Sequence, residues 1–445
     1  MAIKERLLKQ LNIVRDGLCA MPPFHSRDLQ AMRNALVQAR DLCFQGLVPE
    51  NFAKYQDTYE GLLLAMDQME KDGSDTEEIR SLSDELLEYT ISQTQNETAF
   101  KKEIFFLPYK ASMWDSLESV WRAADEDKEH CIAYVMPIPY ADLTPERTVA
   151  EWHYERDMFP QDVPTVHWKD FDLQEIHPNV IFIHNPYDAY SFIISIESHY
   201  SSELLKDQTD KLVYIPYFVL ADPVFEGKSD EEIEKMEEGI EHLVMTPGVL
   251  NAHQVIVQSE AMRRAYIDIL TRQTGQKDRT FWEKRILGTG SPKFDKVVAT
   301  KKEDLDVPEA WLRIIKKSDG TWKKIIFYNT GLTALLQHEE KMLAKIRQVL
   351  QTFKENKDEI ALLWRPHPLM KATIQSLRPE LAEEYERIVA QYKAEGGGIY
   401  DDSADMDRAI VLSDAYYGDG SSIVQLYQKT GKPILIQNVK IESSQ

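Results

Sequence analysis

Residues 409–438 read AIVLSDAYYGDGSSIVQLYQKTGKPILIQN, and this stretch decides the fold class. The apolar run at residues 409–412 has the composition of a buried parallel strand. A polar turn follows at residues 418–422, and the apolar spacing beyond it predicts an amphipathic helix that stops at Gly431. A second apolar strand begins at Pro433. The stretch therefore predicts a strand–loop–helix–strand unit, from which parallel α/β sheets are built.

The polar turn carries groups that suit a phosphate. Gly418 and Gly420 allow the backbone to approach a ligand closely, and Asp419 lies between them. Ser421 and Ser422 stand at the start of the predicted helix, where unpaired N–H groups and the helix dipole attract anions. The plainer interpretation is an ordinary turn in which a serine caps the helix.

A second segment favours the ligand-binding interpretation. Residues 360–364, IALLW, form another buried strand run, which ends in Arg365-Pro366-His367-Pro368. The prolines restrict the backbone and exclude a helix until after Pro368. We therefore expect Arg365 and His367 at the carboxyl end of a strand, the edge where open α/β sheets bind ligands. A lone histidine is more often structural, but an Arg-x-His pair beside a phosphate-friendly loop favours binding.

In this order, these segments resemble the CDP-glycerol glycerophosphotransferase family, which builds teichoic-acid-type polymers in Gram-positive bacteria. Residues 365–368 resemble its R-x-H-P motif, and residues 413–422 its S-D-Y-S-S motif. Residues 290–295, GSPKFD, resemble its G-x-P-R/K-x-D turn, and residues 323–330, KKIIFYNT, its K-x-I-x-Y-x-x-T strand. The similarity is good over residues 255–438, and the preceding part follows the family only in outline.

The resemblance implies a GT-B fold, in which two Rossmann-like domains face each other across a cleft. It also implies that the C-terminal domain binds a nucleotide-diphosphate donor, CDP-glycerol or a related CDP-alditol. Arg365 would pair with the diphosphate, and His367 would hydrogen-bond the phosphate and offset charge on the leaving CMP. The expected donor-binding residues are Asn329, Thr330, Gly331, Arg365, His367, Asp419, Gly420, Ser421 and Ser422.

The chain departs from the family at the expected catalytic base. The family carries a W-H-G-T/S-P motif, whereas residues 211–218 read KLVYIPYF and contain neither histidine nor glycine. His184 is our first candidate for the base, because it follows a buried strand and precedes a proline-fixed turn. His153 and Asp188 rank below it. The catalytic candidates are therefore His184 and His367.

Hydrophobic patterning divides the chain into three parts. Residues 1–98 have helical spacing and form an N-terminal helical extension. Strands alternating with helices then predict a first Rossmann-like, acceptor-side domain at residues 99–278 and a second, donor-binding domain at residues 279–445. The predicted fold class is thus α/β and GT-B-like, with one parallel sheet in each domain.

Composition excludes several classes of function. The net charge of −22 and a pI near 5.0 argue against a nucleic-acid partner. No apolar run is long enough to cross a bilayer, so we expect a cytoplasmic protein, with peripheral association at the inner face of the membrane still open. Three widely spaced cysteines suggest neither disulfides nor a metal site, and no Asp/Glu/His cluster has metal-ligand spacing. We expect no cofactor, and a homo-oligomer is compatible with the sequence.

The predicted function is a transferase with a CDP-linked donor, similar to CDP-glycerol glycerophosphotransferases, in the synthesis of a cell-surface polymer such as teichoic acid or capsule. The hydroxyl acceptor is not identified. One alternative is a GT-B glycosyltransferase with a nucleotide-sugar donor, which needs the same diphosphate site. Another is a catalytically degenerate nucleotide-binding protein that partners a true transferase, which the missing base motif favours.

Overall fold

A computed structural model describes residues 3–20, 26–72, 76–144, 146–188, 190–191, 194–275, 279–367, 370–403 and 405–437. The chain forms two compact units, Met1–Pro216 with Glu226–Gly288 and Tyr217–Phe225 with Thr289–Gln445. The division after Gly288 comes later than the predicted boundary at residue 278. The reason is strand pairing: β9 (Ile286–Leu287) pairs with β8 (Gln254–Ile256) and so belongs to the first sheet.

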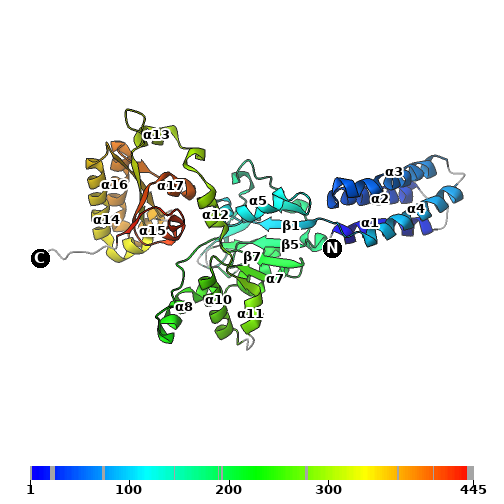
Figure 1. The fold of residues 1–445 in the computed structure, drawn as a ribbon, viewed down its shortest axis with the longest axis horizontal. Coiled ribbons are helices and arrows are strands. Elements are labelled where there is room, and N and C mark those ends of the chain that lie inside the picture. Colours follow the sequence, from blue (N-terminus) through cyan, green and yellow to red (C-terminus); the bar gives the residue numbers. More distant parts are fainter. Residues whose placement is uncertain are drawn as a thin grey trace. The chain divides into compact units, whose positions relative to one another are not determined.

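The N-terminal part is helical, as its apolar spacing predicts, and its described residues form four helices that share one core. Leu7, Leu11, Val14 and Leu18 recur every three or four residues along the first helix and are fully buried. They pack in one hydrophobic core with residues of the other three helices. The helices are α1 (Ile3–Cys19), α2 (Ser26–Gly46), α3 (Pro49–Asp72) and α4 (Thr76–Asn96) (Figure 1).

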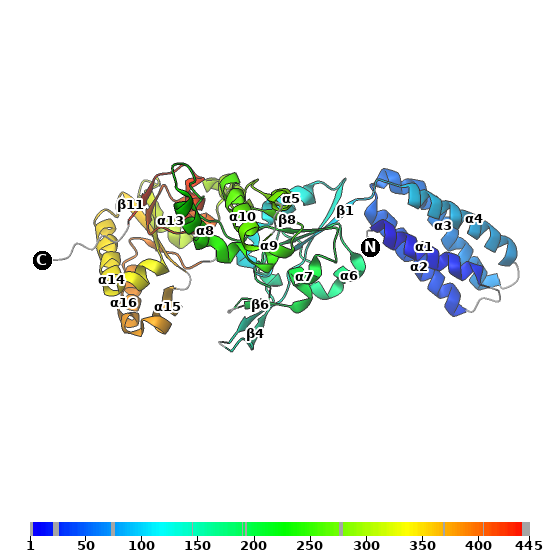
Figure 2. The same cartoon turned by 90° about the horizontal axis from the view of Figure 1, so that it is seen from below.

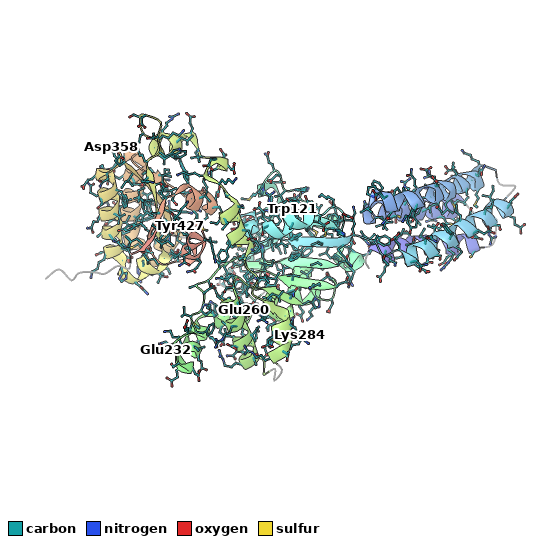
Figure 3. All side chains as sticks on the ribbon, in the orientation of Figure 1. Trp121, Glu232, Glu260, Lys284, Asp358 and Tyr427 are labelled. Atoms are coloured by element: carbon teal, nitrogen blue, oxygen red, sulfur yellow. The ribbon has the colours of Figure 1, made fainter. Side chains whose placement is uncertain are left out.

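The first α/β domain contains a six-stranded parallel sheet in the order β2-β1-β5-β7-β8-β9. Ile104 and Phe106 point to one face and pack with Trp121, whose position is labelled in Figure 3. Its remaining strands are β1 (Lys102–Leu107), β2 (Cys131–Val135), β5 (Val180–Ile183) and β7 (Lys211–Tyr214). Its helices are α5 (Glu118–Glu126), α6 (Leu173–Ile176), α7 (Ser202–Leu205), α8 (Asp230–Val244), α9 (Pro247–Asn251), α10 (Glu260–Gln273) and α11 (Arg279–Arg285).

A small antiparallel sheet is added to this domain, and the sequence did not predict it. Its order is β4 (Val149–His153), β3 (Tyr140–Leu143) and β6 (Ile194–Ile196) (Figure 2). Four of the five residues of β4 are exposed, so the strand lacks the apolar alternation by which strands are recognised.

The second α/β domain contains a five-stranded parallel sheet in the order β12-β11-β10-β13-β14. Phe327 and Leu363 face one core, which includes Tyr427 (Figure 3), and Tyr328 and Trp364 face the other. The strands are β10 (Lys324–Thr330), β11 (Ile360–Pro366), β12 (Ile399–Tyr400), β13 (Ala415–Gly418) and β14 (Ile434–Ile436). The helices are α12 (Pro292–Ala299), α13 (Glu309–Ile315), α14 (Leu332–Glu355), α15 (Met370–Leu377), α16 (Ala382–Glu395), α17 (Met406–Leu412) and α18 (Ser422–Gln428).

The apolar run at residues 409–412 is helical, which corrects our strand prediction. It forms the last turn of α17, and Asp405 caps this helix by accepting the N–H of Arg408 at 2.9 Å. A short buried helix and a short buried strand have the same apolar composition, so periodicity alone could not separate them. The strand of the unit is instead β13, and the predicted helix α18 and strand β14 are confirmed.

The predicted fold class is confirmed: the chain is an α/β protein with two Rossmann-type parallel domains and an N-terminal helical region. Among the described helices, none combines the length and the hydrophobicity needed to span a bilayer.

Candidate functional site

The second sheet brings several predicted residues together at one point of its carboxyl edge. Its strand order reverses between β10 and β13, and open α/β sheets bind ligands at such a switch point. Asn329 lies near the end of β10, and Ser421 follows β13. The Nδ2 atom of Asn329 donates to the hydroxyls of Tyr416 and Ser421, each at 3.1 Å. The structure thus joins two predicted donor-binding residues that are far apart in the sequence.

The carboxylate of Asp419 lies at the N-terminus of α14 and bonds to its backbone. Its Oδ2 atom accepts the N–H of Gly331, the N-cap residue of α14, at 2.8 Å. Its Oδ1 atom lies 3.4 Å from Nζ of Lys345, and both side chains are nearly buried. The Gly331 N–H, which we expected to contact a phosphate, is therefore already bonded to a carboxylate.

Gly418 is required by the close approach of β13 to β10. Its φ is 147°, which side-chain-bearing residues rarely adopt. A Cβ atom at this position would lie 2.2 Å from the carbonyl oxygen of Asn329. We expected Gly418 to allow close approach of a ligand. Instead, its lack of a side chain allows close approach of β10, and this contact fixes the position of Asp419 and Gly420, which follow it.

Arg365 is engaged inside the domain. Its guanidinium is buried and donates to Oδ2 of Asp401 at 2.5 Å and to the carbonyl of Ser403 at 2.7 Å. Asp401 is buried as well and follows β12. The family resemblance assigns the guanidinium N–H groups of Arg365 to a diphosphate. In the structure they bond instead to the segment after β12 and so connect β11 to it.

His367 lies at the carboxyl end of β11, as predicted. Its backbone N–H donates to the carbonyl of Thr330 at 2.9 Å, which holds the residue beside the end of β10. Burial lowers the pKa of the half-buried imidazole below its ordinary value of 6.5. The Thr330 hydroxyl, by contrast, is buried and accepts the indole N–H of Trp364 at 3.2 Å, so that side chain has a structural partner. Pro368 of the predicted motif lies outside the described residues.

The serine motif at residues 413–422 is divided between two edges of the sheet. Asp414 precedes β13, and its Oδ2 atom accepts the N–H of Ile325 at 2.8 Å, near the amino end of β10. Ser421 and Ser422 stand at the carboxyl edge. Ser421 is the N-cap residue of α18 but makes no side-chain capping bond, and Ser422 is exposed. Only the second half of the motif can therefore contribute to a site at the switch point.

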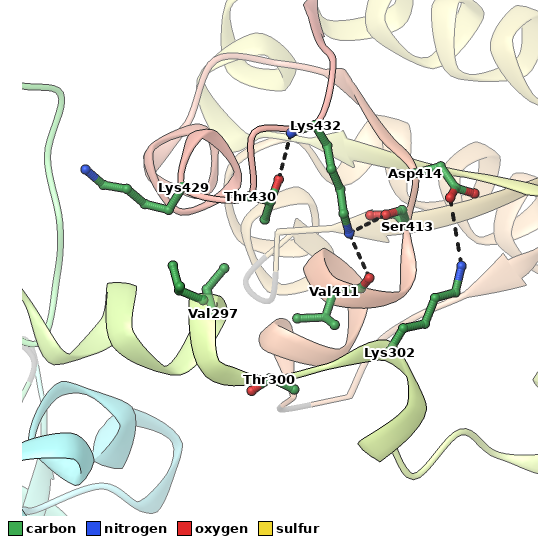
Figure 4. A pocket seen from close by; sticks show the side chains of 10 residues that line it. Val297, Thr300, Lys302, Val411, Ser413, Asp414, Lys429, Thr430 and Lys432 are labelled. Carbon is green, nitrogen blue, oxygen red and sulfur yellow. Dashed lines mark hydrogen bonds and ion pairs between the residues drawn. The ribbon is translucent and has the colours of Figure 1, made fainter.

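A pocket of about 350 Å³ lies at the amino edge and is shown in Figure 4. Lys302 and Lys432 line it, and Lys302 lies 3.9 Å from Asp414. The Nζ atom of Lys432 is bonded at distances between 2.6 and 3.1 Å to the backbone carbonyls of Ile410, Val411 and Ser413. Lys432 thus satisfies carbonyls at the end of α17, which is a structural role.

In the first domain, His184 lies at the switch point between β1 and β5. The side chain is fully buried, and its Nε2 atom accepts the N–H of Tyr109 at 3.1 Å. Its Nδ1 atom lies 2.9 Å from Oγ of Ser116, which donates its own proton to the carbonyl of Met113. These bonds assign a neutral ring that carries its proton on Nδ1. Since the basic nitrogen is occupied, the geometry gives His184 the role of positioning Tyr109 and disfavours it as the base.

Asp188 and His153, the two lower-ranked candidates for the base, differ in their burial and in their hydrogen-bond partners. Asp188 is buried, and its Oδ2 atom accepts the N–H and the hydroxyl of Ser202 at 2.9 and 2.5 Å. His153 is partly exposed, and its Nε2 atom lies 2.9 Å from Oδ2 of Asp142. A neutral His153 that donates from Nε2 keeps Nδ1 as a proton acceptor. Of these candidates, His153 has the geometry of an oriented base.

A series of aromatic contacts connects the switch point to His153. The ring of Tyr109 lies 5.1 Å from that of His184 and 5.6 Å from that of Tyr140, and Tyr140 stacks on His153 at 5.0 Å. The hydroxyl of Tyr140 donates to Glu155 at 2.6 Å. Sequence reasoning missed Tyr140 and Glu155 as parts of a network, because their partners come from separate segments. The aromatic and histidine residues between 152 and 168 were the available signal.

No family model matches the chain, and no curated protein matches it. Solved structures with a similar architecture include a putative UDP-N-acetylglucosamine 2-epimerase from Listeria monocytogenes. It is 14% identical in sequence, the comparison covers 77% of this chain and 80% of that chain, and the TM-score is 0.46. A UDP-GlcNAc 2-epimerase from Neisseria meningitidis bound to UDP-GlcNAc is 10% identical, with coverages of 77% and 84% and a TM-score of 0.42. The wall teichoic acid polymerase TagF is 14% identical, with coverages of 86% and 78% and a TM-score of 0.41. Similarity at this level concerns architecture and not chemistry.

Proposed function

We propose that the protein is a transferase that binds a nucleotide-diphosphate donor, CDP-glycerol or a related CDP-alditol, at the carboxyl edge of its second sheet. The observation that carries the proposal is a juxtaposition at the switch point. Asn329 comes from the strand that resembles K-x-I-x-Y-x-x-T, His367 from the R-x-H-P segment and Ser421 from the serine motif. The Asn329–Ser421 hydrogen bond and the bond from the His367 backbone to Thr330 bring these three segments to one edge.

The structure changes which groups are assigned to the diphosphate. Arg365 and the Gly331 N–H have partners within the domain, so they are not assigned to the ligand. We assign the diphosphate contact to the half-buried His367 imidazole, to the exposed Ser422 hydroxyl and to the backbone of Gly420, because all three lie on the segments that meet at this edge. Asn329 and Ser421 would order the loop that carries them. Such a site works mainly by positioning and charge stabilisation, as phosphoryl transfer requires.

The base would be His153, in place of the absent motif histidine. The acceptor hydroxyl oxygen attacks the phosphorus that carries glycerol, the bond from that phosphorus to the bridging oxygen breaks, and CMP leaves with that oxygen. A base must take the hydroxyl proton, and among the first-domain candidates His153 has the geometry for this role, because Asp142, bonded to its Nε2, would stabilise the imidazolium that forms. The proton then passes to water.

The experiment measures CMP release and ligand binding with CDP-glycerol, CMP and UDP-linked sugars on the full chain. CMP release from CDP-glycerol supports the glycerophosphotransferase, and release of UDP from a UDP-linked sugar supports the nucleotide-sugar alternative. Binding without release from any donor supports the nucleotide-binding partner protein. Absence of both binding and release overturns the proposal.

A further inference from the structure

The first α/β domain contains a pocket of about 410 Å³, a volume within the range of small-molecule sites. It lies beside the small antiparallel sheet, whose β4 and β6 are labelled in Figure 2. Trp152 and His153 of β4 line it, together with His167, Trp168 and Glu197. Its walls are thus aromatic rings with a few polar groups among them.

The aromatic groups expose large apolar surface to the pocket. Trp152 is 53% exposed, and it lines the pocket. Trp168 is partly exposed; its ring forms a T-shaped pair with the ring of Tyr200 at a centroid distance of 6.3 Å, and Nζ of Lys169 lies 5.2 Å from its centroid. A ligand with a flat apolar face would cover this surface.

The polar groups of the pocket are oriented by bonds to their own segments. Nδ1 of His167 accepts the N–H of Lys169 at 3.1 Å, which leaves Nε2 to donate. Oε2 of Glu197 accepts the N–H of His199 at 3.0 Å and keeps capacity for another donor, whereas Oε1 accepts from Nδ1 of His199 at 2.9 Å and from the hydroxyl of Ser198 at 3.4 Å. The pocket therefore presents an N–H donor and a carboxylate acceptor beside aromatic faces.

The charges around the pocket select against an anionic ligand. Glu197 lines the pocket, and Asp142 is bonded to His153 at its edge. Among the described lining residues, Lys169 is the only lysine or arginine, and its ammonium group lies over Trp168. A phosphate in this pocket would meet carboxylates with little basic compensation. A neutral ligand with several hydroxyl groups is not repelled by these carboxylates. Its hydroxyls can donate to a carboxylate and accept from an imidazole N–H.

We propose that this pocket binds a neutral sugar ring, with its C–H face on Trp152 and Trp168 and its hydroxyls toward Glu197, His167 and His153. The sugar is the part of the acceptor that presents the reacting hydroxyl, and this assignment rests on the transferase function proposed above. Sugar binding itself does not depend on that function, because the pocket belongs wholly to the first domain.

The experiment is saturation-transfer NMR on the full chain without nucleotide, with methyl glucoside, methyl galactoside, methyl mannoside and methyl N-acetylglucosaminide as probes. We expect transfer to the ring protons of at least one probe and a loss of affinity of about tenfold or more in Trp152→Ala. Trp322→Ala is the matched control, because Trp322 is 43% exposed and belongs to the second unit. We expect it to bind the probes like the unaltered protein.

Transfer to none of the four glycosides, or transfer that Trp152→Ala leaves intact, overturns the proposal. Glucose 6-phosphate tests the charge argument, and binding as tight as that of methyl glucoside also overturns it. Absence of sugar binding in the unaltered protein, together with CMP release from CDP-glycerol, would reject the sugar pocket alone. Sugar binding in a chain that binds and cleaves no nucleotide donor would reject the transferase alone.

Discussion

The carboxylate of Asp419 accepts the backbone N–H of Gly331 at 2.8 Å, and the two residues lie 88 positions apart in the sequence. A helix N-terminus attracts anions, and here the protein supplies the anion itself. Lys345 lies 3.4 Å from the same carboxylate and balances its charge. The Gly331 N–H is therefore already bonded within the protein, and the diphosphate site that we propose uses the His367 imidazole and the Ser422 hydroxyl instead.

Asp419→Ala should lower the free energy of unfolding by about 3 kcal/mol, because it leaves the Lys345 ammonium and the Gly331 N–H without their shared partner. Urea denaturation measures this change. Asp358→Ala is the control, since Asp358 is exposed (Figure 3), and it should change stability by no more than about 0.5 kcal/mol. Equal stability of the two variants would show that the carboxylate does not hold the helix start.

His153→Gln should reduce CMP release by about a hundredfold to ten-thousandfold and leave the affinity for CDP-glycerol unchanged, because a general base acts on the acceptor. His130→Gln is a matched control: His130 also pairs with an aspartate, Asp127, at 2.8 Å, but it is exposed. Its rate should remain that of the unaltered protein. Undiminished CMP release by the His153 variant would remove this residue from the mechanism.

His184→Ala should destabilise the first domain by about 1–3 kcal/mol, because the buried N–H of Tyr109 loses its acceptor. CMP release per folded molecule should fall far less than in His153→Gln. The checks are urea denaturation and a rate corrected for the folded fraction. A fully stable His184 variant that no longer releases CMP would return the base role to His184.

The affinity for CDP-glycerol should rise as the pH falls from 8 toward 6. Burial lowers the pKa of His367 below 6.5, so the free protein holds a neutral ring at pH 7. A bound diphosphate favours the charged ring and raises this pKa, so binding takes up a proton. Titration calorimetry in buffers of different ionisation enthalpy measures that uptake. His367→Gln should remove the His367 share of it, and an unchanged pH dependence in this variant would exclude His367 from the phosphate site.

The same pKa shift has a consequence for the ligand-free protein. Because the folded state holds His367 neutral, the unfolded chain binds more protons as the pH falls through 6.5. The contribution of this residue to stability is therefore fully present above pH 6.5 and decreases below it. Comparison of urea denaturation at pH 7.5 and pH 5.5 in the protein and in His367→Gln isolates this contribution.

Ser421→Ala and Ser422→Ala should have different effects. Ser421 accepts a hydrogen bond from Asn329, so its loss should cost about 1 kcal/mol of stability. Ser422 is exposed, so its loss should leave the melting temperature unchanged and weaken CDP-glycerol binding. If neither variant changes the affinity, the serine loop is not part of the phosphate site.

The sequence by itself determined the α/β class, the strands at residues 323–330 and 360–364, and the helical character of the N-terminal region. These follow from local information, because buried strands such as residues 360–364 are continuous apolar runs and bundle helices repeat an apolar residue every three or four positions. It also placed Asn329, His367 and Ser421 on segments that meet at one edge. Where local information was ambiguous, the prediction failed, as for α17, whose apolar end has the composition of a strand.

Only the tertiary structure decided which polar groups are available to a ligand. The bonds of Arg365 to Asp401, of Asp419 to Gly331 and of His184 to Tyr109 join residues between 36 and 88 positions apart. No local pattern encodes such pairs, since each partner is specified by how strands are ordered in a sheet. The same holds for the aromatic pocket, whose walls come from β4, from the segment around Trp168 and from Glu197. A buried polar group satisfies its hydrogen bonds wherever the fold places a partner, and only the fold reveals which groups have already found one.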